Sequence, residues 1–398
     1  MTIKAKHIFL GAALFTGMSF FSSCEDDRFV EQVNQVVQSS EQNGAIIPGK
    51  YIVRFKDNGS KEGLSYKKAK TDVRMEATAM LAAHSISSDV ITETYGVAIR
   101  GFAANLTEAE VAALQTNPNI SIEPDRIVSL GRPGSGGGSS AAQETPWGIT
   151  RVGGATANVS GRAWVLDSGI DLDHEDLNVD VANSRTFITS GKDARDADDG
   201  NGHGTHCAGT IAAIDNSVGV IGVAPGALVV AVKVLDSRGS GAYSGVIAGV
   251  DYVASAASPG DVASMSLGGP ASPALDDAIK AAAAKGIYFA LAAGNESQDA
   301  ANVSPARVNG ANIFTVSAID INDRFASFSN YGNPPVDVAA PGVSVKSTWK
   351  GGGYNTISGT SMATPHVAGL LLATGGNLGT DGNALNDPDG NADPIAHK

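Results

Sequence analysis

The stretch GTSMATPHVAG at residues 359–369 joins a glycine-rich approach to a segment rich in Ala and Leu. This pattern predicts a helix that begins near Ser361, where unpaired backbone N–H groups and the helix dipole favour developing negative charge. A serine hydroxyl becomes a good nucleophile only when a base takes its proton. Ser361 therefore needs a partner elsewhere in the chain.

Two upstream segments offer the missing groups. NGHGTHCAG at residues 201–209 places His203 at a glycine-flanked helix start, and AWVLDSGI at residues 163–170 places Asp167 at the end of an apolar strand. The chain order Asp, His, Ser is one of the known orders of the serine-protease triad. We assign Ser361 as the nucleophile, His203 as the general base and Asp167 as the group that orients His203.

These segments resemble the subtilase family of serine peptidases. The motifs PWGI (146–149), HGTHCAG (203–209), GSGAYS (239–244) and SFSNYG (327–332) are most similar to its proteinase K-like branch. The resemblance covers roughly residues 144–375, which we take as the catalytic domain. It implies a serine endopeptidase of proteins and peptides that needs no cofactor for catalysis, with Asn295 as the oxyanion donor. We expect a monomer.

From residue 149 onward, apolar strands alternate with helices. Strands are expected at residues 163–167, 228–234, 261–266, 287–292, 313–318 and 336–339, and helices at 203–213, 244–257, 273–285 and 361–374. This order predicts an α/β fold with a doubly wound, mostly parallel sheet, whose site lies beyond the strand C-termini. Asp167, Ser266 and Asn295 all fall at such ends.

The resemblance also implies how a substrate is held. Two backbone edges, Gly239-Ser240-Gly241 and Ser266-Leu267-Gly268, are expected to bind an extended peptide as an added strand. Ala292, Ala293 and Gly294 are expected to form a wall of a roomy apolar primary pocket, with Tyr243 closing a more distant one. Asp337 and the carbonyls of Ala311 and Ile313 match a structural calcium site.

Residues 47–130 form a separate unit. Their expected order is β-α-β-β-α-β, that of a small ferredoxin-like α+β domain, with a capping box opening its second helix at Thr107. The unit resembles the subtilase propeptide, whose last strand reads like IEPD (122–125), so we expect an intramolecular inhibitor with its tail in the cleft. A stand-alone domain is the alternative. The Gly/Ser linker at 131–143 should carry the self-cleaved maturation site, between about residues 136 and 143.

The N-terminus reads as an export signal. Residues 1–24 combine two early lysines with an apolar run at 8–21, too short for a spanning helix. FSSC (21–24) resembles a bacterial lipoprotein box with Cys24 as the lipid-bearing residue, and 25–46 reads as a polar tether. We predict a cell-surface or outer-membrane lipoprotein with a lipid anchor; an ordinary secreted protein is the alternative.

The remaining features indicate no further chemistry. A formal net charge of −13 argues against nucleic-acid binding, and two cysteines exclude a disulfide scaffold. Cys207 is expected to be a buried thiol, the acidic loop at 193–199 a solvated loop rather than a metal site, and residues 376–398 a disordered acidic tail. His203 and His206 lack a third ligand, which disfavours a metallopeptidase.

Two other classes of function remain as alternatives. One is a catalytically idle subtilase-fold domain that serves as a surface binding module. The other is an α/β-hydrolase esterase, which needs Gly-x-Ser-x-Gly around its nucleophile; here Ala363 replaces the second glycine.

Overall fold

The computed structural model describes residues 43–56, 63–130 and 142–398. All of them belong to one of the two units into which the chain divides, Ser39–Lys398. The predicted signal with Cys24, most of the tether and nearly all of the linker lie outside the described residues. Within those ranges no helix is both long and apolar enough to cross a membrane.

A ten-stranded sheet forms the centre of the catalytic domain, in the order β18-β19-β15-β14-β12-β10-β5-β8-β6, with β7 also paired to β8. Every pair in it is parallel except β18–β19. The doubly wound fold predicted from the sequence is therefore confirmed. The inner strands are β5 (Arg162–Asp167), β8 (Leu228–Lys233), β10 (Val262–Met265), β12 (Tyr288–Ala292), β14 (Ile313–Ile319) and β15 (Val336–Pro341), with β6 (Asn178–Val179) and β7 (Arg185–Thr186) at one edge.

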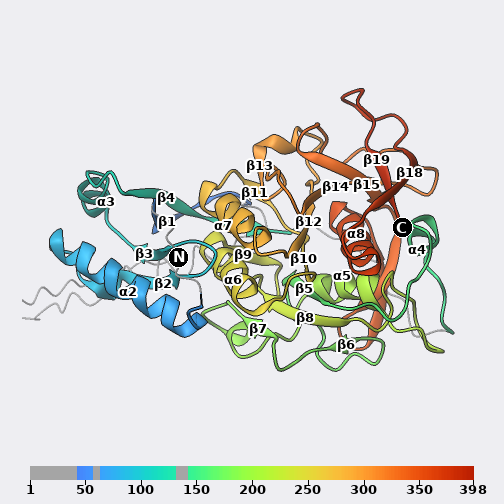
Figure 1. Ribbon diagram of the computed structural model, residues 1–398, viewed down its shortest axis with the longest axis horizontal. Coiled ribbons are helices and arrows are strands. Elements are labelled where there is room, and N and C mark those ends of the chain that lie inside the picture. The colour runs from blue at the N-terminus through green and yellow to red at the C-terminus, as the bar shows by residue number, and fades with distance from the viewer. Residues whose placement is uncertain (1–42, 57–62, 131–141) are drawn as a thin grey trace, which may run out of the picture. The chain divides into compact units, whose positions relative to one another are not determined.

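Both faces of this sheet are covered because its strands are apolar on both sides. In β5, Trp164 and Leu166 pack in the core that contains α6 and α7, whereas Ala163 and Val165 pack in the core of α5 and α8. Figure 1 shows these two helix pairs on opposite sides of the strands. The helices are α5 (His203–Ala212), α6 (Tyr243–Ala256), α7 (Pro273–Ala283) and α8 (Thr360–Thr374).

The N-terminal unit has the predicted β-α-β-β-α-β order. Its antiparallel strands lie in the sheet order β2-β3-β1-β4, and β9 of the catalytic domain adds a fifth strand beside β4. Its elements are β1 (Ile46–Phe55), α2 (Tyr66–Ala83), η2 (Ser88–Val90), β2 (Ile91–Tyr95), β3 (Gly101–Asn105), α3 (Glu108–Leu114) and β4 (Ile120–Ser129), with β9 at Ser240–Ala242.

Several short elements were not predicted. They contain too few residues for a periodic pattern, and tertiary contacts define them. They are α4 (Trp147–Arg151), η3 (Lys192–Ala194), β11 (Gly269–Pro270), η4 (Ala300–Asn302), β13 (Val303–Ser304), β16 (Val345–Trp349) and β17 (Gly353–Ile357).

The expectation of a disordered tail at 376–398 is wrong. Residues in this segment form β18 (Gly379–Asn383) and β19 (Pro394–His397), and β19 pairs with β15 at the edge of the main sheet. Ile395 is fully buried there. The buried Asp393 accepts hydrogen bonds from Ser317 and Asn333, and burial raises its pKa to about 6. The segment escaped prediction because its apolar residues are few and widely spaced.

Candidate active site

Asp167 and His203 form a buried pair at the carboxyl end of the parallel sheet. Asp167 ends β5, and His203 begins α5, with its Nδ1 2.9 Å from both carboxylate oxygens. Burial acts to lower the pKa of His203, but the interactions with Asp167 and Cys207 together raise that pKa well above its usual value. Because Nδ1–H donates to Asp167, Nε2 is left to act as the base.

Glycine lets the two segments approach this closely. A Cβ on Gly204 would lie 2.0 Å from the carbonyl oxygen of Gly169, so a side chain there would push α5 away from β5. Asp199 then fixes the helix start: its carboxylate accepts from the backbone N–H of Gly202 and Thr205, each at 2.9 Å. The expectation of a solvated loop is therefore wrong for Asp199, which is buried.

Ser361 lies in the first turn of α8, next to the pair. Its Oγ donates to the Ser266 carbonyl at 3.2 Å in this conformation, and no hydrogen bond joins it to His203. Cys207 bridges the two regions, since its Sγ lies 3.9 Å from His203 Nδ1 and 3.5 Å from the Ser361 carbonyl oxygen. Ser361 and His203 thus both lie beside the Cys207 thiol, and catalytic contacts often tighten only when substrate binds.

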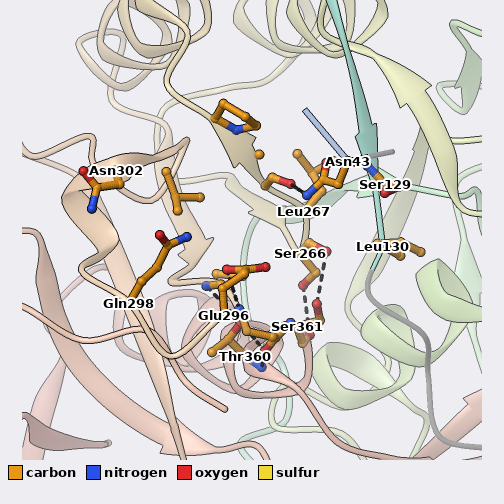
Figure 2. Close-up of a pocket in the computed structure, with 17 residues that line it drawn as sticks. Asn43, Ser129, Leu130, Ser266, Leu267, Glu296, Gln298, Asn302, Thr360 and Ser361 are labelled. Atoms are coloured by element: carbon orange, nitrogen blue, oxygen red, sulfur yellow. Dashed lines mark hydrogen bonds between the residues drawn. The ribbon is translucent and has the colours of Figure 1, made fainter. Parts of the chain in front are cut away.

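Asn295 follows β12 and has a fixed orientation. Its Oδ1 accepts hydrogen bonds from the backbone N–H of Thr360 at 2.8 Å and from the Thr360 hydroxyl at 3.0 Å. A backbone N–H can only donate, so this contact assigns Oδ1 and leaves the NH2 group as a donor. Asn295 and Ser361 line the same cavity. Figure 2 shows Ser361 there beside Thr360 and Ser266. A donor fixed beside a nucleophile can stabilise an oxyanion.

The cavity has a volume of about 400 Å³ and is lined by five of the ten residues predicted to bind substrate, together with Asn295 and Ser361. Those on its wall are Ser266, Leu267, Gly268, Ala292, Gly294, Asn295 and Ser361. Ala293 and Tyr243 are instead buried in hydrophobic clusters, and the Tyr243 hydroxyl donates to the Pro270 carbonyl at 2.7 Å. The wall also contains the polar side chains of Glu296, Gln298 and Asn302, and the apolar primary pocket stays a prediction.

The predicted substrate edge at Gly239-Ser240-Gly241 is occupied by the N-terminal domain. In the antiparallel ladder between β4 and β9, Val128 faces Gly241 and Ser129 faces Ser240. Leu130 continues the pairing, since its N–H donates to the Gly239 carbonyl at 2.9 Å. A peptide segment of the same chain thus lies where an extended substrate is expected to bind.

Acidic side chains attach this domain to two helices of the catalytic domain. Asp125 accepts from the backbone N–H of Ser244 at 3.1 Å, and Glu123 accepts from Ala274 N at 3.3 Å, at the starts of α6 and α7. In the opposite direction, Asp251 of α6 accepts from three successive backbone N–H groups at residues 96–98. Negative charge at a helix N-terminus is favourable, so these contacts stabilise the association.

Asn43 is a contact that the sequence analysis missed. Its Nδ2 donates to the Gly268 carbonyl at 3.0 Å, and its Oδ1 accepts from Ser129 N at 3.1 Å. Gly44 N and the Ala45 carbonyl pair with Ile127. Residues 43–46 therefore belong to the folded domain and not to the tether, which was predicted to reach residue 46. A single polar residue in a polar stretch carries no sequence signal for such a contact.

The other predicted groups are also placed. Cys207 is fully buried, as expected, and burial raises the pKa of its thiol. Asp167, His203 and Cys207 are the one group of three potential metal ligands found among the described residues. Here Asp167 already binds His203, and His206 donates to the Val345 carbonyl at 3.0 Å, so the His203/His206 pair forms no metal site. Asp337 lies on β15 beside Thr315 of β14, and Ile313 and the exposed Ala311 precede Thr315 in the chain.

The amino-acid sequence is similar to two protein-family models and to known serine proteases. Residues 164–374 match the family model described as Subtilase family, and residues 50–131 match Peptidase inhibitor I9. The alkaline serine protease ver112 of Corniculantispora psalliotae is 38% identical over 85% of this chain and 83% of its own. Subtilisin NAT of Bacillus subtilis subsp. natto is 40% identical over 77% of this chain and 80% of its own.

A solved structure is similar as well. It is a cold adapted subtilisin-like serine proteinase, 40% identical, with a TM-score of 0.55 over 63% of this chain and 97% of that chain.

The fixed amide of Asn295 generates a kinetic prediction. Asn295→Leu keeps the side-chain volume but removes the donor, and should lower kcat by about 10²–10³ with little change in KM. Steady-state hydrolysis of a chromogenic peptide measures both constants. Asn302→Leu, which removes another amide from the same wall, serves as the control and should leave kcat near wild type. Equal losses in the two variants would contradict the oxyanion assignment.

Proposed function

The chain belongs to the subtilase family of serine proteases, and from this membership we propose that Asp167, His203, Asn295 and Ser361 together hydrolyse peptide bonds. It is a serine protease that carries an inhibitory propeptide domain at its N-terminal side. The observation that supports the residue assignment most strongly is the buried contact of 2.9 Å between Asp167 and His203. The idle binding module remains the alternative.

The proposed mechanism follows from the placement of each group. Ser361 Oγ turns from the Ser266 carbonyl towards the substrate and attacks the scissile carbonyl carbon, while His203 Nε2 takes its proton. Asp167 stabilises the imidazolium ion, and the Asn295 NH2 group donates to the oxyanion. His203 then returns the proton to the leaving amine. A water molecule then attacks the acyl-enzyme, with His203 again taking and returning the proton, and the acid product is released.

We propose that the N-terminal domain both inhibits the enzyme and is cleaved by it. Leu130, its last described residue, lines the cavity that contains Ser361. Because Leu130 already reaches this cavity, we place the scissile bond early in the linker, before the range 136–143 expected from the sequence. Pairing of β4 with β9 holds the tail in the cleft after cleavage, which is how a cleaved propeptide can remain an inhibitor.

Intact-mass measurement of purified precursors tests this proposal. The wild-type precursor should split within residues 131–143, and Ser361→Ala should stay intact because it lacks the nucleophile. Circular dichroism of both proteins verifies that they fold alike. If both split at the same bond, another protease matures the chain; if neither splits despite correct folding, the binding module becomes the better account.

We further propose that Asn43 fastens the inhibitory tail. Asn43→Ala removes the link between the tail and Gly268, in which Asn43 accepts from Ser129 N and donates to the Gly268 carbonyl. Loss of this link should weaken retention by about 1.4 kcal/mol, or about tenfold. When the precursor is mixed with a chromogenic peptide, the lag before hydrolysis begins should then be shorter than in wild type. Asn105→Ala, an exposed amide of the same domain, is the control. Equal activation times for Asn43→Ala and wild type would refute the fastening role.

We propose that the protein is exported and anchored to lipid through Cys24. The support is the sequence of residues 1–24 and the family membership. Metabolic labelling with a radioactive fatty acid should label wild type and leave Cys24→Ser unlabelled. Label on both variants would place the lipid elsewhere, and label on neither would favour the secreted alternative.

We also propose a structural calcium ion at Asp337, with the carbonyls of Ala311 and Ile313. Burial raises the pKa of Asp337 to about 6, and its carboxylate accepts one backbone hydrogen bond, from Thr315 N at 2.8 Å. Such a carboxylate retains lone pairs for a hard cation. The ion would add stability and no chemistry. A chelator should lower the Tm of wild type and leave that of Asp337→Asn unchanged; equal shifts would contradict the site.

A further inference from the structure

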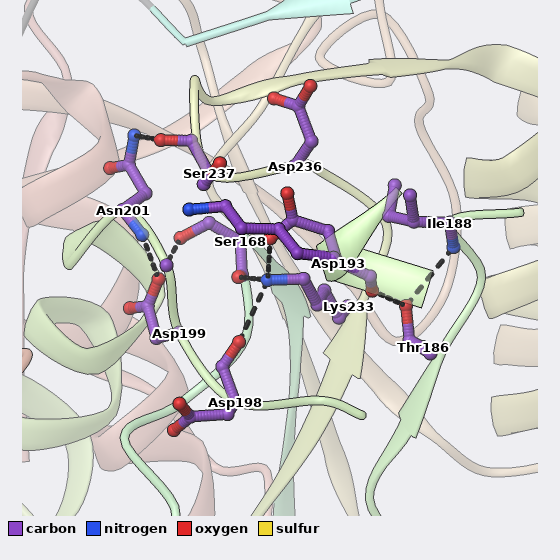
Figure 3. Close-up of polar contacts among 12 residues, drawn as sticks. Ser168, Thr186, Ile188, Asp193, Asp198, Asp199, Asn201, Lys233, Asp236 and Ser237 are labelled. Atoms are coloured by element: carbon purple, nitrogen blue, oxygen red, sulfur yellow. Dashed lines mark hydrogen bonds and ion pairs between the residues drawn. The ribbon is translucent and has the colours of Figure 1, made fainter. Parts of the chain in front are cut away.

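A fully buried lysine lies beside Asp167 in the neighbouring strand of the sheet. Lys233 is the last residue of β8 and is fully buried. Its Nζ donates to the carbonyl oxygens of Ser168 and Asp198, each at 2.8 Å, and pairs with Asp193 Oδ1 at 3.1 Å (Figure 3). An ammonium group has three N–H donors, so the three contacts use all of them.

Two of these contacts hold the segments that carry Asp167 and His203. Ser168 directly follows Asp167, which is itself the register partner of Lys233 in the β5–β8 ladder. Asp198 directly precedes Asp199, whose carboxylate fixes the start of α5 at His203. One ammonium group thus joins the end of the aspartate strand to the loop that sets the position of the histidine.

The third contact, between Lys233 and Asp193, connects the lysine to the turn that precedes the β9 edge. Burial acts to raise the pKa of Asp193, but hydrogen bonds from Lys233 and Ser237 lower it overall, which keeps the carboxylate ionised. Ser237 lies in the turn between β8 and β9, two residues before Gly239. Asn201, from the loop before His203, donates to the same turn through the Ser237 carbonyl at 3.4 Å.

We propose that Lys233 is a positioning residue for peptide hydrolysis, an internal cation that holds the Asp167 strand, the His203 loop and the β9 edge at fixed separations. Two carbonyl oxygens and a carboxylate are the ligand types of a hard-cation site, and the ammonium takes the cation's place. Without it, buried oxygens would lose their donors and the segments would move apart.

The proposal rests on the proposed function of the triad, and steady-state kinetics of the matured enzyme test it. Lys233→Met keeps the apolar stem and removes the donors; kcat should fall by about 100-fold, the effect of a misplacement of roughly 1 Å. Asp193→Ala removes the carboxylate, leaves Lys233 on its two carbonyls and loosens only the β9 edge, so KM should rise while kcat stays near wild type. Lys350→Met is the control, because the exposed Lys350 also donates to a carbonyl of the His203 loop.

Cation rescue separates positioning from folding. Lys233→Ala leaves a small space between the three oxygens, and ammonium chloride should restore its kcat at least tenfold, whereas choline chloride at equal ionic strength should not. A purely structural loss would not respond to a small cation.

Each outcome decides the question. Wild-type kcat and KM in Lys233→Met overturn the proposal, as does a loss in Lys233→Ala that ammonium does not reverse. If the Lys233 variants do not fold, Asp193→Ala decides: a raised KM at unchanged kcat supports the proposal, and unchanged constants overturn it. An inactive wild-type enzyme would instead refute the proposed function.

Discussion

The contact between the Asp167 carboxylate and His203 is the interaction on which the rest of the structure depends. A buried carboxylate is costly unless it is hydrogen-bonded, and Asp167 receives N–H groups from Ser168 at 2.7 Å and from His203. Parallel topology brings the end of β5 and the start of α5 to one edge of the sheet. Glycine at position 204 then permits their close approach, and Asp199 fixes the helix start.

The N-terminal domain completes features that the catalytic domain lacks by itself. α6 begins after Ala242, which offers no side-chain cap, and Asp125 of the propeptide supplies the missing acceptor to Ser244. The same domain provides β4 as a partner for the β9 edge. Capping and strand pairing explain physically how this domain associates with the catalytic domain and covers the β9 edge.

The sequence predicted the elements with long apolar patterns and failed where structure depends on distant contacts. β5 and α5 lie within one residue of their expected bounds because continuous apolar runs and glycine turns mark them. Asn43 and the polar pocket residue Glu296 gave no signal, since their contacts come from segments far apart in the chain. Lys233 lies inside the expected strand at 228–234 and carried no signal of its own, and the strands of residues 376–398 were too short and polar to recognise.

Covalent labelling of the matured enzyme tests the central claim most directly. A sulfonyl fluoride reacts with a serine that a neighbouring base activates. The account predicts hydrolysis of a chromogenic peptide that stops when one sulfonyl group is attached, with peptide mapping locating the group on Ser361. His203→Ala should be neither active nor labelled. A folded protein that hydrolyses no peptide, or that is inactivated by labelling at another residue, would contradict the account.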